Sequence, residues 1–186
     1  TTTAVAAKRW FGIPVVAKLL RGGALGDVSK LQTRRGGGSR LSLFKEKVDR
    51  FITISQEIDA ELEMLDIPKS RRIFIPNGVD TEHYHPISAT QKTGLREKLQ
   101  LPSGSITLFT GRLSPEKRVD QLIAIWPSVR QQHPDANLVL VGTGEDEAML
   151  KAKAGDGVHF IGRVPDVATY LQAADLFVLP SATEGL

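Results

Sequence analysis

The sequence predicts an α/β protein built from mostly parallel sheets. Short runs rich in Val, Ile and Leu alternate with segments of helical periodicity over the 186 residues, which is typical of strand–helix–strand units. Several runs are continuously apolar, as expected for strands covered by helices on both faces. A stretch near residue 80 lacks this periodicity, so we expect two sheets, one on either side of it.

Seven segments are predicted as strands. Three precede the break and four follow it: Pro14–Lys18, Phe51–Ser55 and Arg72–Ile75, then Ile106–Thr110, Asn137–Val141, His159–Ile161 and Leu176–Leu179. Two apolar stripes have helical spacing and are expected to lie in the core rather than in a ligand site: Val119, Leu122, Trp126 and Val129, and Ile58, Leu62 and Leu65.

The break predicts a domain boundary. In Ile75–Asp80, the Asn77-Gly78 pair favours a tight turn with positive backbone dihedrals. We place the boundary near Pro86, so that residues 1–85 form the C-terminal part of one Rossmann-like domain and residues 86–186 the first part of a second. Because the chain begins with Thr1 and ends directly after a strand, we expect it to be a fragment, with both domains incomplete.

The composition excludes several classes of function. The 24 Lys and Arg against 21 Asp and Glu give a net charge of +3, too small to indicate nucleic acid or anionic lipid as a partner. The absence of Cys excludes disulfides, thiolate catalysis and Cys-ligated metals, and it fits a cytoplasmic protein. The apolar runs fall well short of the ~20 residues that a membrane-spanning helix needs.

Three further patterns have weak functional interpretations. Thr33–Arg40 is rich in Arg and Gly, but without interleaved aromatics a surface loop is favoured over a nucleic-acid segment. His83 and His85 could form a metal pair, although solvated linker histidines are favoured because no further His or Cys accompanies them. Gly142-Thr143-Gly144 lacks the third glycine of a dinucleotide fingerprint, so it favours a tight strand-to-helix turn.

The segment after Ile106–Thr110 carries the strongest chemical signal. Ser114 and Pro115 predict a helix start, with the Ser114 hydroxyl accepting a hydrogen bond from the first turn. Arg112 and Lys117 would then lie beside a helix N-terminus at the carboxyl end of a strand. A guanidinium, an ammonium and backbone N–H groups at such a place can form a diphosphate pocket, and two solvated cations at a helix entry are an equally good interpretation of this segment alone. After the last strand, Glu184 could accept hydrogen bonds from sugar hydroxyls, and Gly185 would permit close approach.

Taken in order, five segments resemble the retaining glycosyltransferases of family 4, also called glycosyl transferases group 1, which have the GT-B fold of two Rossmann-like domains. Each segment alone is weak evidence, whereas five in this order are specific. They are Ile75–Asp80, Gly111-Arg112 with Lys117 five residues after Arg112, Leu138–Gly144, Val158–Val164 and Leu179–Gly185.

The resemblance implies an EC 2.4 enzyme that transfers a hexose from a UDP-, GDP- or ADP-sugar with retention. It implies that Arg112, Lys117 and Glu184 are the catalytic set and that no metal or other cofactor is needed. The implied donor-binding residues are Gly111, Arg112, Lys117, Gly162, Arg163, Val164, Glu184, Gly185 and Leu186. The strand at Pro14–Lys18 and the loop Gly22–Asp27 would lie on the acceptor side.

The same resemblance suggests a polysaccharide or lipid-linked glycan acceptor, no nucleic-acid partner and a cytoplasmic location, at the inner face of the membrane for a lipid-linked acceptor. We expect the fragment itself to be inactive. The alternatives are an epimerase or phosphorylase of the same fold, or a non-catalytic nucleotide- or phosphosugar-binding module. A glycoside hydrolase would require two carboxylates, and only Glu184 is a candidate.

Overall fold

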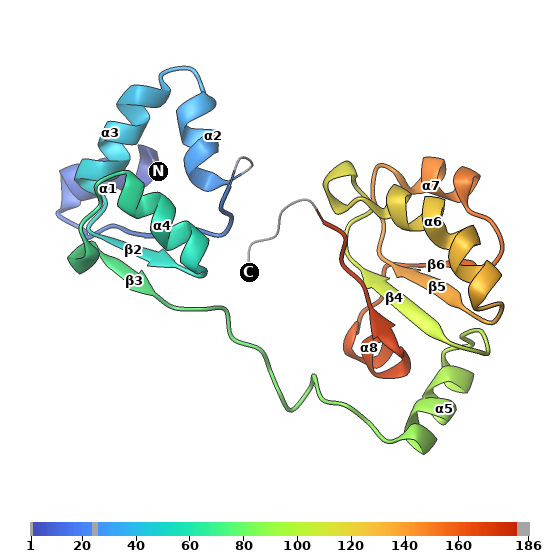
Figure 1. Cartoon of the computed structure of the whole chain (residues 1–186). Helices are drawn as coiled ribbons and strands as arrows, with labels where there is room; N and C mark the ends of the chain where they lie inside the picture. Colours follow the sequence, from blue (N-terminus) through green and yellow to red (C-terminus); the bar gives the residue numbers. More distant parts are fainter. Residues whose placement is uncertain (1, 24–25, 182–186) are drawn as a thin grey trace. The chain divides into compact units, whose positions relative to one another are not determined.

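The chain forms two α/β units, each built around its own parallel sheet (Figure 1). The computed structural model describes residues 2–23 and 26–181. Contacts divide these residues after Gly78, a short distance before Pro86, where the sequence predicts the boundary. The α/β class and the parallel pairing are confirmed, and the seven strands coincide with the seven predicted segments to within a few residues.

The first unit has a three-stranded sheet of order β1-β2-β3, with α2, α3 and α4 on one side of it (Figure 1). Its strands are β1 (Val16–Lys18), β2 (Arg50–Thr53) and β3 (Arg72–Phe74). Its helices are α1 (Thr2–Phe11), α2 (Asp27–Thr33), α3 (Gly37–Lys47), α4 (Gln56–Met64) and the 3-10 turn η1 (Lys69–Arg71). Phe51, Ile58 and Leu62 are fully buried in its core, which confirms the second predicted stripe.

Polar contacts tie the edges of this unit to its sheet. Lys8 Nζ donates to Asp49 Oδ1 at 2.6 Å, and the Val15 N–H donates to Asp49 Oδ2 at 2.8 Å. These two bonds lower the pKa of Asp49 below its usual 3.8. Arg72 Nη1 donates to Asp59 Oδ2 at 2.9 Å, which joins β3 to α4. The first helix and the edge strand are therefore held by charge-assisted bonds as well as by apolar packing.

The second unit has a four-stranded sheet of order β6-β5-β4-β7. Its strands are β4 (Ile106–Thr110), β5 (Asn137–Val141), β6 (Val158–Gly162) and β7 (Leu176–Phe177). Its helices are α5 (Ala89–Lys98), the 3-10 turn η2 (Pro115–Lys117), α6 (Val119–Gln132), α7 (Glu147–Lys153) and α8 (Ala168–Ala173). None of the helices in the described part of the chain is long and apolar enough to cross a membrane.

Helices cover both faces of the second sheet. Phe109, Leu138 and Leu140 face α6 and α7, and the predicted stripe on α6 packs into this core through Val119, Leu122, Trp126 and Val129. Val139 and Val141 point the other way and pack with residues of α8. All five residues of β5 are buried. Such two-sided cover explains why these strands are continuously apolar rather than alternating.

Two local predictions are wrong. Neither Asn77 nor Gly78 has a positive φ, and the chain turns instead at Asp80, whose Oδ1 accepts from the N–H groups of Glu82 and His83 at 3.1 Å. The predicted loop Thr33–Arg40 is also shorter than expected, because α3 begins at Gly37. A Cβ on Gly37 would lie 2.0 Å from the Gln32 carbonyl oxygen, so glycine permits a tight corner between α2 and α3.

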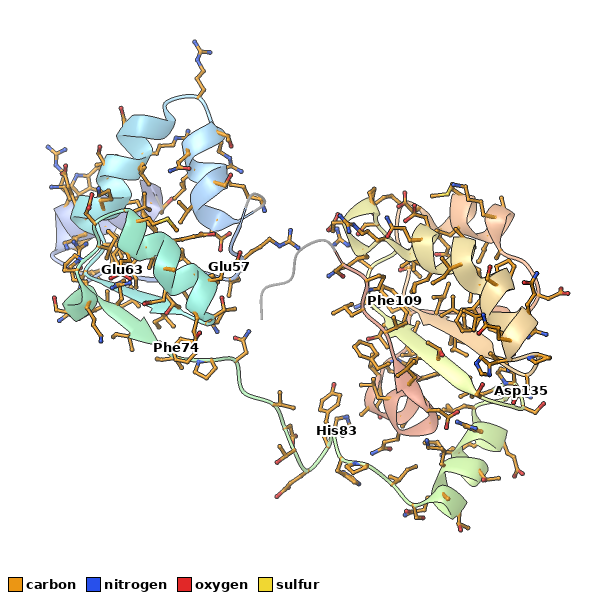
Figure 2. All side chains as sticks on the ribbon, viewed as in Figure 1. Glu57, Glu63, Phe74, His83, Phe109 and Asp135 are labelled. Carbon is orange, nitrogen blue, oxygen red and sulfur yellow. The ribbon has the colours of Figure 1, made fainter. Side chains whose placement is uncertain are left out.

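The two histidines after Asp80 are exposed but have hydrogen-bond partners within the second unit. His83, labelled on the segment before α5 in Figure 2, has Nε2 3.0 Å from Asp166 Oδ1. His85 Nδ1 lies 2.7 Å from the Glu82 carbonyl oxygen. The interpretation as solvated linker histidines is therefore only half right. No group of three metal-ligating side chains gathers here or elsewhere in the described ranges.

Asp175, just before β7, joins three elements of the second unit. Its Oδ2 accepts from the Ile106 N–H at 2.8 Å and from Arg96 Nη2 at 2.6 Å, and its Oδ1 accepts from Lys92 Nζ at 3.1 Å. Burial of the carboxyl raises its pKa, but these bonds lower it by more, so the pKa of Asp175 falls below its usual 3.8. The carboxylate thus fixes α5 against the start of β4.

We expect Asp175→Asn to lower the free energy of unfolding of the second unit by about 1–2 kcal/mol at pH 7, because an amide cannot replace the ion pairs. Since the folded pKa is depressed, the stabilisation is complete above pH ~4 and is lost as the pH falls below it. Urea unfolding followed by Trp126 fluorescence in a Trp10→Phe background measures both effects. The control is Asp156→Asn, at an exposed carboxylate without a polar partner in the described part of the chain. Equal destabilisation by both variants would contradict this role of Asp175.

Candidate functional site

The candidate site lies at the carboxyl edge of the second sheet, where the loops after β4, β5 and β6 meet. Because the strands are parallel, their carboxyl ends share one edge, and ligands of open α/β sheets bind outside such edges. The loop after β4 runs from Gly111 to Arg118 and contains both predicted diphosphate-binding cations, Arg112 and Lys117. We call it the Arg112 loop.

Backbone hydrogen bonds continue from the sheet into these loops. Gly111 N donates to the Val141 carbonyl at 3.0 Å, and Leu113 N donates to the Thr143 carbonyl at 3.1 Å. Asp146 N donates back to the Leu113 carbonyl at 3.1 Å. The Arg112 loop is therefore fixed on both sides of Arg112 to the loop that follows β5.

Gly142 and Gly144 are needed because the two loops approach so closely. A Cβ on Gly142 would lie 1.9 Å from the Gly111 carbonyl oxygen, and one on Gly144 would lie 2.1 Å from the Leu113 carbonyl oxygen. Gly142 also has a φ of 137°, which side chains disfavour. The interpretation of Gly142-Thr143-Gly144 as a tight turn rather than a dinucleotide site therefore has a physical cause, which is contact between two chain segments.

A bulge brings the end of β6 to the same edge. The pairing of β5 and β6 shifts between Leu140 and Val141, so that Phe160 is opposite Leu140 whereas Gly162 is opposite Val141. Ile161 is the extra residue, and such bulges often redirect a strand beside a functional site. Gly142 N then donates to the Gly162 carbonyl at 2.8 Å. The predicted segment Gly162, Arg163 and Val164 is thereby joined through Gly142 to the Arg112 loop.

The helix start differs from the prediction. Ser114 is buried, but its hydroxyl caps no helix and has no partner within the described ranges. Pro115–Lys117 form the short η2 turn instead, closed by Lys117 N donating to the Ser114 carbonyl at 2.9 Å. Arg118 has a left-handed φ of 52°, and α6 begins only at Val119. This strained residue redirects the chain, so Lys117 lies on η2 and not on the long helix.

The Arg112 loop presents positive charge from a rigid base. Arg112 is exposed and Lys117 is half-buried, while Leu113 between them is fully buried and anchors the loop. Phe109 of β4, labelled in Figure 2, lies below Gly111, since a Cβ there would be 3.1 Å from its ring. The loop carries three cations, Arg112, Lys117 and Arg118, and one carboxylate, Glu116. This excess of positive charge suits an anionic ligand such as a diphosphate.

The remaining residues of the predicted donor site lie in different surroundings. Gly111 and Gly162 take part in the edge hydrogen bonds, Arg163 is exposed, and Val164 packs into the α8-side core. β7 runs beside β4, and Val178 N donates to the Leu108 carbonyl at 2.9 Å, which directs the chain toward the same edge. Glu184, Gly185 and Leu186, which follow, lie outside the described residues.

Sequence reasoning missed the residues that shape this edge through their backbone. The bulge at Ile161, the left-handed Arg118 and the Thr143 carbonyl have no local sequence signature. Among the residues of this edge, only the glycines indicate from sequence that another group approaches closely. They do not indicate which group it is.

Comparison with known proteins places this edge within a family. The family model described as glycosyl transferases group 1 matches residues 104–186. A GDP-mannose-dependent monoacylated alpha-(1-6)-phosphatidylinositol monomannoside mannosyltransferase from Corynebacterium glutamicum is 32% identical over 95% of this chain and 51% of its own length. A glycogen synthase from Mycobacterium tuberculosis is 28% identical over 97% of this chain and 44% of its own.

Solved structures show the same fold. The Anabaena protein HepE, crystallised with UDP-glucose, has a TM-score of 0.76 at 22% identity over 97% of this chain and 50% of its own. A sucrose-phosphate synthase from Thermosynechococcus elongatus has a TM-score of 0.72 at 24% identity over 97% of this chain and 48% of its own. The chain spans about half the length of these relatives.

The fold and the edge define the class as an α/β protein of GT-B architecture with a cationic loop at the carboxyl edge of its second sheet. Residues 104–186 therefore match the group 1 glycosyltransferases, and the whole chain is similar to members of that family.

We expect Gly144→Ala to loosen the Arg112 loop, because the new methyl group would overlap the Leu113 carbonyl oxygen. The stability of the second unit should fall by about 1–3 kcal/mol. Hydrogen exchange of the Leu113 and Asp146 amides should accelerate. Gly155→Ala is the matched control, since a Cβ there has nothing within 4 Å. Unchanged exchange at both amides in Gly144→Ala would contradict the proposed packing.

Proposed function

We propose that the protein transfers a sugar from a nucleotide-sugar donor to an acceptor hydroxyl with retention of anomeric configuration. The observation that carries the proposal is the Arg112 loop, with Arg112 and Lys117 anchored at the carboxyl edge of the second sheet. This loop falls inside the segment that matches the family model. The same matches favour a glycosyltransferase over an epimerase, a phosphorylase or a non-catalytic binding module.

The two cations address the difficult part of the reaction. As the bond between the anomeric carbon and the diphosphate breaks, positive charge develops at the carbon and negative charge at the departing diphosphate. Positive groups held in place before the reaction stabilise such charge without reorganising, and each is worth about 3–4 kcal/mol. On this proposal Arg112 and Lys117 serve the leaving group, so no divalent metal is required.

The proposed step balances without a protein nucleophile. The acceptor oxygen forms its bond to the anomeric carbon on the face from which the diphosphate leaves. The acceptor hydroxyl proton passes to the departing diphosphate oxygen. In this proposal Glu184 contacts the donor sugar, and the segment Gly162–Val164 lies against the base.

The relatives bound the proposed substrates. One is named for GDP-mannose and a phosphatidylinositol mannoside, another is a glycogen synthase, and a structural neighbour was crystallised with UDP-glucose. We therefore propose a UDP-, GDP- or ADP-sugar donor and a polysaccharide or lipid-linked glycan acceptor. The proposed site of action is the cytoplasm, at the inner face of the membrane for a lipid-linked acceptor.

We expect Arg112→Ala and Lys117→Ala each to weaken donor binding by about 10- to 100-fold, because each removes one positive side chain that would contact the diphosphate. The 186-residue chain is titrated by calorimetry with UDP-glucose, GDP-mannose and ADP-glucose, and the tightest donor is used for the variants.

Lys153→Ala is the control, since it removes one exposed charge from the end of α7 in the same unit. Its donor affinity should stay within about twofold of wild type. Unchanged affinity in both loop variants, or an equal loss in the control, would overturn the assignment of the diphosphate pocket.

A further inference from the structure

A second cationic pocket lies in the first unit, at the carboxyl end of β1. Its volume is about 330 Å³. Cationic side chains come from β1 and from the end of α2, and α3 contributes an aromatic ring. The residues relevant here are Lys18, Asp27, Lys30, Leu31, Arg34 and Phe44. We call it the β1 pocket. All its lining residues belong to the first unit, whereas the Arg112 loop belongs to the second.

Internal hydrogen bonds tie the described residues after β1 to the start of α2. Asp27 Oδ2 accepts from the N–H groups of Leu20 at 2.7 Å and Arg21 at 3.3 Å. A Cβ on Gly26 would lie 2.8 Å from the Arg21 carbonyl oxygen, so the loop folds tightly on itself. Glu57 of α4, labelled in Figure 2, contacts this loop, since a Cβ on Gly22 would lie 3.2 Å from its carboxyl carbon. Two residues that line the pocket here, Leu20 and Asp27, are therefore held together by a hydrogen bond within the unit.

The charges in the β1 pocket do not cancel. Three cations face one carboxylate, and that carboxylate already accepts two backbone N–H groups. Lys18 Nζ donates to Asn77 Oδ1 at 3.0 Å, a neutral partner that leaves its charge uncompensated. Lys30 and Arg34 have no ion-pair partner among the described residues, and both are exposed. The pocket has an excess of two positive charges.

We propose that the β1 pocket binds a phosphate group carried by the acceptor. A phosphomonoester has a charge of about −1.5 to −2 at pH 7, which matches the excess of positive charge, whereas a carboxylate needs only one guanidinium. The half-buried, apolar Leu31 offers a surface for the part of the acceptor next to the phosphate, whereas Phe44 is largely buried in the core. That the phosphate belongs to the acceptor rests on the proposed function, in which the donor occupies the second unit. That the pocket binds a phosphate does not rest on it.

The test is calorimetric titration of the 186-residue chain with glycerol 3-phosphate. Lys30→Gln/Arg34→Gln should weaken binding by about tenfold or more, because two charge-assisted contacts are lost. Arg40→Gln/Lys69→Gln is the matched control: it removes the same charge from exposed positions of the same unit that do not line the pocket. This control should retain affinity within about twofold.

A third variant separates this inference from the donor site. Arg112→Ala/Lys117→Ala should leave glycerol 3-phosphate binding unchanged even when nucleotide-sugar binding is lost. The inference is overturned if wild type does not bind glycerol 3-phosphate, if Lys30→Gln/Arg34→Gln binds it normally, or if the Arg112/Lys117 variant loses it. Failure of UDP-sugar binding alone would overturn the proposed function and leave the phosphate pocket standing.

Vesicles distinguish the source of the phosphate. We compare sedimentation with phosphatidylcholine vesicles that contain phosphatidic acid and with vesicles of phosphatidylcholine alone. Binding that needs phosphatidic acid and is lost in Lys30→Gln/Arg34→Gln, but not in its control, supports a lipid-borne phosphate. Binding of glycerol 3-phosphate without vesicle binding supports a soluble phosphorylated acceptor.

Discussion

The Arg112 loop depends on three backbone hydrogen bonds that extend the second sheet beyond its strands. They run from Gly111 to Val141, from Leu113 to Thr143 and from Gly142 to Gly162. The first two join loops that approach so closely that only glycine fits at positions 142 and 144. This framework fixes the backbone of the loop that carries the cations. Since electrostatic stabilisation depends on groups that do not reorganise, the backbone framework is part of the site.

The two cationic sites follow from one topological fact. In each unit all strands run parallel, so every loop that leaves a strand end reaches the same edge of its sheet. In the first unit this edge carries Lys18, with Lys30 and Arg34 supplied by the following helix. In the second it carries Arg112 and Lys117. A transferase needs two substrates, and a chain with two such edges can provide a separate anionic recognition site for each.

The strands could be predicted from sequence, because a buried parallel strand must be apolar on both faces and so produces a distinct run. The start of α5 also has a sequence signature, since Ser88 and Gln91 form a capping box. The error at Ser114 has another cause. Ser followed by Pro fits a 3-10 turn as well as an α-helix, and the left-handed Arg118 decides between them. The predicted loop at Thr33–Arg40 is too long because the glycines at the corner between α2 and α3 have the same sequence pattern as loop glycines.

At the candidate site, the sequence predicts charged side chains but not the packing that holds them. A glycine in the sequence indicates that something comes close, but it does not say whether that is a ligand or another part of the chain. At Gly144 the neighbour is the Leu113 carbonyl, so this residue acts on Arg112 through the backbone and need not touch a substrate. The charged residues are predicted from sequence because binding an anion requires cationic side chains. The residues that hold them were ambiguous because their role depends on distances between segments about thirty positions apart, which no local pattern encodes.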